Sequence, residues 1–135
     1  MTNYEEILAY LPALQDHASK FCYYGEPADD SYEEYDAVNE EGKSLVMSLE
    51  CNEMNETIAA DLQGIDYPSV LAKASVDLET LNEDTLKGAD LDTVCAILLA
   101  YIDSLSEGDV MIDALASGMF TKVMEHLQNL VKEKA

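Results

Sequence analysis

The sequence predicts an all-α, or nearly all-α, single domain of five to seven short helices over residues 1–135. Apolar residues recur at helical spacing in several segments, β-branched runs are few, and no Asn-Gly or Asp-Gly pair marks a tight hairpin. A length of 135 residues is that of one domain. An apolar share of 48% is ordinary for a folded protein, although the net charge is −21. We therefore expect a compact, acidic helical bundle.

The first helical segment carries Ile7, Leu8, Leu11 and Leu14 at helical spacing. Pro12 interrupts it, so we expect two short helices or a kink. Residues 21–24 follow as a short strand or extended edge, which Gly25 and Pro27 end.

Residues 26–41 hold eight acids and no basic residue. Ser31 followed by Glu34 matches a capping box, which favours an acidic helix over part of this segment. An extended loop fits the same residues equally well. The predicted fold therefore includes an acidic loop or short extended segment near residues 20–43.

The next helix is expected to begin near Ser44 and to stop at Gly64. Pro68 suits the first turn of a further short helix, with Asp66 as its N-cap. In this part of the chain the apolar residues are less regularly spaced, because residues 52–55 are mostly polar.

Residues 91–105 give the clearest helical pattern, and their apolar face extends almost all the way round. A helix of that kind is buried, so we place it at the centre of the bundle. Asp90 is its expected N-cap, and Gly88 ends the preceding helix. Ser106 and Asp109 flank the next start, and Gly118 separates that helix from a last one running from about Met119 to Lys132.

Several short motifs occur along the chain in a recognisable order. They are Tyr10-Leu11-Pro12, Gly64-Ile65-Asp66-Tyr67, Ala89-Asp90-Leu91, Glu107-Gly108 and Gly118. This order resembles a bacterial domain family of unknown function (family six-five-zero-eight), mainly over residues 85–130. The family's Arg-Phe pair before Glu-Gly is replaced here by Ser104 and Leu105. The resemblance implies a helical domain and no particular activity.

The residues usually needed for catalysis are scarce. His17 and His126 lie in no metal-binding or catalytic spacing, and the chain has no G-x-S-x-G elbow, no P-loop and no Arg. The acidic stretches lack EF-hand spacing. The sequence therefore predicts a non-enzymatic protein with no cofactor and no dedicated metal site.

The three cysteines, Cys22, Cys51 and Cys95, are odd in number and widely spaced, as expected of free thiols in a reducing cytoplasm. The longest apolar run, residues 94–102, falls short of the ~20 residues that span a membrane. The charge argues against direct nucleic-acid binding, which depends on Lys and Arg. We therefore expect a cytoplasmic protein bound to neither membrane nor nucleic acid.

Negative charge is concentrated between Lys20 and Lys73, where thirteen acids accompany one base, Lys43. Solubility alone is one interpretation. The other is imitation of nucleic acid, whose charges lie ~3.4 Å apart along each strand. Carboxylates at i and i+4 on one helix lie ~6 Å apart, which is too dilute, but two acidic elements side by side approach that density.

Our leading hypothesis is therefore a protein-binding module, in its most specific form a DNA-mimic-like inhibitor or modulator of a basic nucleic-acid-binding protein. Such proteins are typical of phage and mobile elements. Tyrosine is common at interaction hot spots, so tyrosines join the acids in the expected contact set. That set is Asp29, Asp30, Tyr32, Glu33, Glu34, Tyr35, Asp36, Glu40 and Glu41.

The alternative is a small helical accessory or oligomeric protein whose charge serves only solubility. It would bind through an apolar patch, for example the side of the C-terminal helices that carries Met111, Met119 and Met124. Homo-oligomerisation is open under either hypothesis. Salt distinguishes the two, because ionic strength weakens a charged interface far more than an apolar one.

Overall fold

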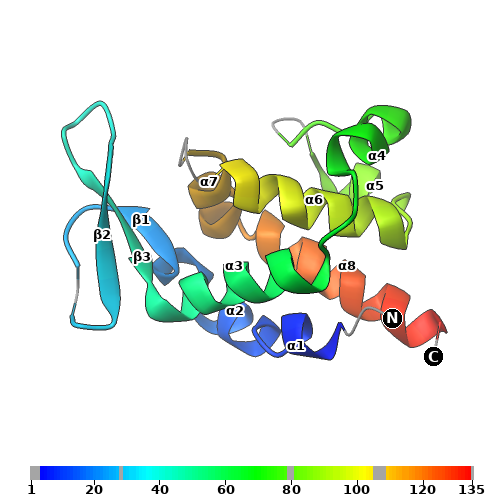
Figure 1. Ribbon diagram of the computed structural model, residues 1–135, viewed down its shortest axis with the longest axis horizontal. Coiled ribbons are helices and arrows are strands. Elements are labelled where there is room, and N and C mark those ends of the chain that lie inside the picture. The colour runs from blue at the N-terminus through cyan, green and yellow to red at the C-terminus, as the bar shows by residue number, and fades with distance from the viewer. Residues whose placement is uncertain (1–3, 28, 79–80, 105–108, 135) are drawn as a thin grey trace.

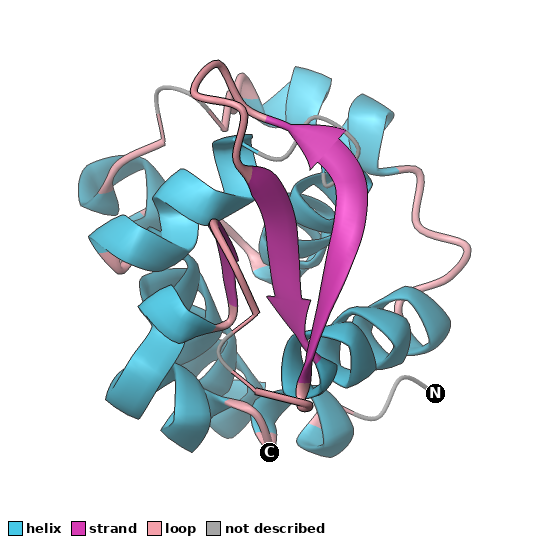
Figure 2. Ribbon diagram, turned by 90° about the vertical axis from the view of Figure 1, so that its left-hand side faces the viewer, coloured by secondary structure: helices cyan, strands magenta, loops and turns pink. Residues whose placement is uncertain are grey.

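A computed structural model of the chain describes residues 4–27, 29–78, 81–104 and 109–134. It confirms a mostly α-helical, compact fold and adds a small three-stranded sheet. The sheet lies at one end of the molecule and the helices form the rest (Figure 1). Viewed from that end, β2 and β3 lie in front of the helices (Figure 2).

The N-terminal segment forms two short helices, α1 (Glu5–Leu8) and α2 (Leu11–His17), as the position of Pro12 predicted. A 3-10 turn, η1 (Ala18–Lys20), leads into strand β1 (Cys22–Tyr24), which confirms the expected extended edge. Ile7, Leu11 and Leu14 are buried in the main core.

The acidic segment forms a strand, so the predicted acidic helix from Ser31 is wrong and the extended alternative is right. Strand β2 (Tyr32–Val38) pairs antiparallel with β3 (Ser44–Ser48), and the order across the sheet is β1-β3-β2. The turn between them is closed by Asn39, whose side-chain oxygen accepts hydrogen bonds from the backbone N–H groups of Glu41 and Lys43. Gly42 adopts φ +82°, which other residues rarely tolerate.

The predicted helix start near Ser44 is also wrong, because residues 44–48 are the central strand and helix α3 runs Leu49–Asp61. Leu45 and Met47 face the main core, and Val46, on the opposite face, is also fully buried. Three consecutive apolar residues buried on two faces suit a central strand better than one side of a helix. The Ser48 hydroxyl caps α3 by accepting from the Cys51 N–H at 3.0 Å.

The predicted boundaries of the later helices agree with the structure. Asp66 caps α4 (Tyr67–Ala74), and Gly88 follows α5 (Glu83–Lys87). Asp90 caps α6 (Leu91–Asp103), accepting from the Thr93 N–H at 2.9 Å. Gly118, at φ +87°, separates α7 (Asp109–Ser117) from α8 (Met119–Lys134). Leu105 and Ser106, which the sequence placed around the end of α6 and the next start, lie outside the described residues.

Helix α6 lies at the centre, as its all-round apolar pattern predicted. Val94, Ile97 and Leu98 are fully buried, and α6 packs against α3, α4, α7 and α8. Met111 and Met124 are also fully buried, so these two residues of the predicted apolar side are not on the surface, whereas Met119 is half-buried. Both face the core because their helices are amphipathic and turn those positions inward.

Candidate functional site

The sheet and α3 meet where β3 ends and α3 begins, and this junction brings two acidic elements together. Glu33 of β2 lies directly across from Met47 of β3. Cross-strand partners point to the same face, so Glu33 points to the helical side of the sheet, at its edge. There it meets the outward face of α3, which follows Ser48 directly.

A shallow groove of about 320 Å³ lies between these elements. We call it the acidic groove, and define it by the residues that line it. They are Glu33, Tyr35, Leu49, Asn52, Glu53 and Glu56. All three glutamates are exposed, and Leu49 is 42% exposed, which is unusual for a leucine in this chain. The groove is thus an exposed surface that combines carboxylates, an aromatic ring and an apolar side chain.

Hydrogen bonds fix one wall of the acidic groove. The Tyr35 hydroxyl lies 2.9 Å from Asn52 Oδ1 and 3.2 Å from Glu33 Oε2, while Asn52 Nδ2 lies 3.5 Å from the same Glu33 oxygen. Burial raises the pKa of Tyr35, so its hydroxyl stays protonated and can donate one of these bonds. The triangle ties β2 to α3 and holds the Glu33 carboxylate on the groove.

The α3 wall follows from helical periodicity. Cys51, Met54 and Ile58 are buried, so Glu53 and Glu56 fall on the opposite, solvated face. Glu50 lies three residues before Glu53 and is also exposed, so Glu50, Glu53 and Glu56 follow one another at three-residue intervals. Acids at this spacing repel one another, which costs stability rather than adding it.

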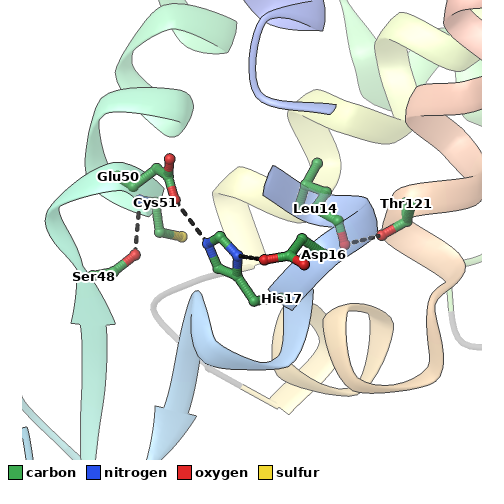
Figure 3. A network of polar contacts seen from close by, with 7 residues as sticks. All are labelled: Leu14, Asp16, His17, Ser48, Glu50, Cys51 and Thr121. Carbon is green, nitrogen blue, oxygen red and sulfur yellow. Dashed lines mark hydrogen bonds and ion pairs between the residues drawn. The ribbon is translucent and has the colours of Figure 1, made fainter. Parts of the chain in front are cut away.

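Glu50 belongs to a polar network that joins α2 to the start of α3 (Figure 3). His17 Nε2 lies 3.1 Å from Glu50 Oε1, and His17 Nδ1 lies 2.9 Å from Asp16 Oδ2. The bond to Asp16, followed by that to Glu50, raises the pKa of His17 above its ordinary 6.5. Both ring nitrogens of His17 are engaged, and its contact with Glu50, which we call the His17 clamp, links the end of α2 to the first turn of α3. Glu50 lies 33 residues from His17 along the chain, so no local sequence pattern could predict this contact.

The nine residues predicted as the contact set do not share one surface. Glu33 and Tyr35 line the acidic groove. Tyr32 and Glu34 lie on the outer face of the sheet, where Tyr32 packs edge-to-face with Tyr23 at 5.7 Å between ring centres. The backbone of Asp36 lies in β2, and its side chain is outside the described residues.

The remaining four residues of that set lie in turns. Asp29 and Asp30 precede β2, and Asp29 accepts hydrogen bonds from the Ser31 hydroxyl and, at 2.8 Å, from its backbone N–H, which lower the pKa of Asp29. Glu40 and Glu41 lie in the β2–β3 turn, at the end of the hairpin away from α3 (Figure 1). Residues 26–41 therefore do not form one continuous surface.

The structure also limits what else the chain can do chemically. Cys22, Cys51 and Cys95 are buried free thiols, and burial raises the pKa of Cys22 to about 12 and that of Cys95 to about 11. They are therefore poor nucleophiles. His126 bonds the backbone carbonyl of Ala89 at 3.1 Å. In the described part of the chain, no group of three or more His, Cys, Asp or Glu side chains is placed to hold a metal ion.

Two further findings concern membrane-spanning helices and similarity to known proteins. Within the described ranges, none of the helices combines the length and apolar character needed to traverse a bilayer.

Comparisons with protein-family models, curated proteins and solved structures find no match to this chain. The resemblance to the bacterial family of unknown function therefore stays a prediction.

Proposed function

We propose that this chain is a protein-binding module whose acidic groove and neighbouring acids occupy the basic, nucleic-acid-binding surface of a partner protein. The observation that carries the proposal is the meeting of acids from two separate elements, Glu33 of β2 with Glu53 and Glu56 of α3, along one groove. No lysine is among the described residues that line it. Lys43 lies at the far turn of the hairpin and pairs with Glu41 at 3.4 Å.

The spacing of these charges supports imitation of a nucleic-acid backbone. Residues three apart on α3 advance about 4.5 Å along the helix axis, against ~3.4 Å between phosphates along one DNA strand. Glu33 adds carboxylate density from a second element beside that row. A basic groove that binds phosphates would therefore meet a comparable charge density here.

Leu49 and Tyr35 add apolar contact area to the charged groove. An exposed leucine and a half-buried tyrosine in the middle of the carboxylates offer apolar contact area, and tyrosine is enriched among residues that dominate binding energy. Because Tyr35 is already held by Asn52, little side-chain freedom is lost on binding. Charge would speed and orient association, and these side chains would hold the complex.

The test compares two triple variants with the same change in net charge. The groove variant is Glu33→Gln, Glu53→Gln and Glu56→Gln. The control variant, Asp30→Asn, Glu34→Gln and Glu40→Gln, takes acids from residues 26–41 that lie outside the groove. Each is used as bait in cell lysate, at low and at high salt, with and without excess duplex DNA.

We expect the wild-type chain and the control variant to capture a nucleic-acid-binding protein that both salt and DNA displace. We expect the groove variant to bind that protein at least about tenfold more weakly. Equal weakening of both variants would show that only total charge matters, and the groove assignment would be wrong. Capture of a partner that neither salt nor DNA displaces would refute the proposed function.

A further inference from the structure

A second hollow, separate from the acidic groove, lies among α6, α7, α8 and the chain before α5. It has a volume of about 570 Å³ and is partly open to solvent. Among the described residues, its apolar lining includes Leu78, Leu81, Val110, Ala114 and Met119. A volume of this size is within the range of small-molecule sites.

The polar side chains among the described lining residues are those of Tyr101, Asp113 and Ser117. The Ser117 hydroxyl is engaged within its own helix end, near the carbonyl of Ala114 and the N–H of Met119, both at 3.4 Å. Tyr101 is 1% exposed and also lines the cavity, and its ring packs on Phe120 with centres 5.5 Å apart. Among the described residues, the enclosed side-chain atoms that lack a hydrogen-bond partner are Asn55 Oδ1 and Asp61 Oδ2, and the Tyr101 hydroxyl is not one of them. A phenol on the wall of a cavity can bond with water or with a ligand that enters it.

Asp113 supplies the only charge among the described lining residues. It lies on α7 together with Val110, Ala114 and Ser117, at spacings of three and four residues, so these side chains share the helix face that borders the cavity. Its carboxylate is exposed and makes no ion pair or hydrogen bond within the described part of the chain. Ala114 of α7 and Tyr101 of α6 both line the cavity.

We propose that this cavity binds a small amphiphilic amine, with its apolar body against the leucines and its ammonium group hydrogen-bonded to the Tyr101 hydroxyl and paired with Asp113. An ammonium group supplies only donors, and both the phenol oxygen and the carboxylate accept. A chain with a net charge of −21 repels anions, so a cation is favoured over an acid of the same shape. Apolar side chains beside a few polar groups are typical of ligand sites.

The experiment uses three probes that share an indole ring: tryptamine, neutral tryptophol and indole-3-acetate. Each is titrated into the full chain at ~0.15 M salt, where surface attraction is screened beyond ~8 Å. Backbone amide shifts in a two-dimensional NMR spectrum locate the site. We expect tryptamine to shift Leu81, Ala114 and Met119, to bind about tenfold more tightly than tryptophol, and indole-3-acetate to bind weakest.

Two conservative variants test the assigned contacts. Tyr101→Phe keeps the ring against Phe120 and removes only the hydroxyl, so we expect tryptamine to bind roughly 2- to 10-fold more weakly. Asp113→Asn should weaken tryptamine and leave tryptophol unchanged. Because Asp113 is exposed, this variant should fold normally, which keeps the test decisive if Tyr101→Phe proves unstable.

Three outcomes would overturn the proposal. No shift at these amides at millimolar probe would mean that water alone satisfies the Tyr101 hydroxyl. Shifts confined to the acidic groove would mean that tryptamine is attracted only by surface charge. Equal binding of tryptamine and indole-3-acetate would remove the roles of the ammonium group and of Asp113.

Discussion

Replacing Ser48 by alanine removes the hydrogen bond that starts α3. The Ser48 hydroxyl accepts from the Cys51 N–H at 3.0 Å, and both residues are buried, with 8% and 0% of their surface exposed. Alanine leaves that N–H without an acceptor at a place that water reaches poorly. The junction of β3 and α3, which sets how Glu33 faces Glu53, would loosen at the same point.

The size of this effect follows from the burial. Loss of an N-cap side chain costs ~0.5–2 kcal/mol, and a buried donor left without a partner costs ~1–3 kcal/mol. We therefore expect Ser48→Ala to lower the free energy of unfolding by about 2 kcal/mol. Asn82 makes the same kind of bond to the Thr85 N–H at 2.9 Å, but it is exposed, so water can replace it. Asn82→Ala should cost only about 0.5–1 kcal/mol.

The assay is equilibrium unfolding in urea, followed by circular dichroism, for wild type, Ser48→Ala, Ser48→Thr and Asn82→Ala. Ser48→Thr keeps the hydroxyl and should stay close to wild type. The slope of free energy against urea should be unchanged among the variants, since none alters the surface exposed on unfolding. If Ser48→Ala costs no more than Asn82→Ala, burial does not set the value of this cap and the reasoning is refuted.

Three further predictions concern charge and thiols. Glu53→Gln should stabilise the chain by about 0.4–1 kcal/mol at low salt, because it removes two like-charge contacts at three-residue spacing on α3. This gain in stability should shrink as salt is added. A loss of stability in Glu53→Gln would contradict the proposed repulsion. His17 has a raised pKa in the folded state, so its stabilising contribution is full below about pH 6.5 and is lost as pH rises through that raised value. The urea midpoints of wild type and His17→Gln should therefore differ more at about pH 5.5 than at about pH 8.5, and a constant gap would exclude the clamp. Cys22 and Cys95, buried and with raised pKa values, should react with a thiol reagent only as fast as the chain opens, so labelling that is rapid without denaturant would contradict their placement.

The helices were predictable where local signals agree with the tertiary structure. Asp90 before an apolar stretch and Gly118 between two helices each fix a boundary through backbone hydrogen bonding or a positive φ. These effects act within a few residues, so the sequence displays them directly. The same is true of Pro12, which sits in the first turn of α2.

The sheet was harder to predict because its stabilisation is not local. Glu and Asp are depleted in strands, so the composition of residues 32–38 argues against β2. That strand forms because β3 offers it a partner, and β3 is in turn paired with β1 on its other side. The run Leu45-Val46-Met47 fits either a helix or a central strand until both neighbours are known.

In the acidic groove, too, some features follow from local sequence and others depend on tertiary structure. The outward position of Glu53 and Glu56 could be read from the buried positions of Cys51, Met54 and Ile58 by helical periodicity. Their proximity to Glu33 could not, because it depends on the β2–β3 register and on a helix that follows β3 without a linker. The predicted contact set includes Glu33 and Tyr35 of the acidic groove and leaves out the α3 half.

Strand β2 has β3 on one side only, and within the described residues no strand pairs with its other edge. An open edge of this kind is a template on which identical chains can stack into fibrils. The exposed carboxylates of Glu33 and Glu34 oppose such stacking, because each added copy would bring like charges together. Their protection depends on ionisation, so acid should remove it and let the edges join. Glu33, which is proposed to attract a basic partner, thus also helps to keep the chains apart, and any variant that neutralises Glu33 or Glu34 needs its oligomeric state measured before its binding is interpreted.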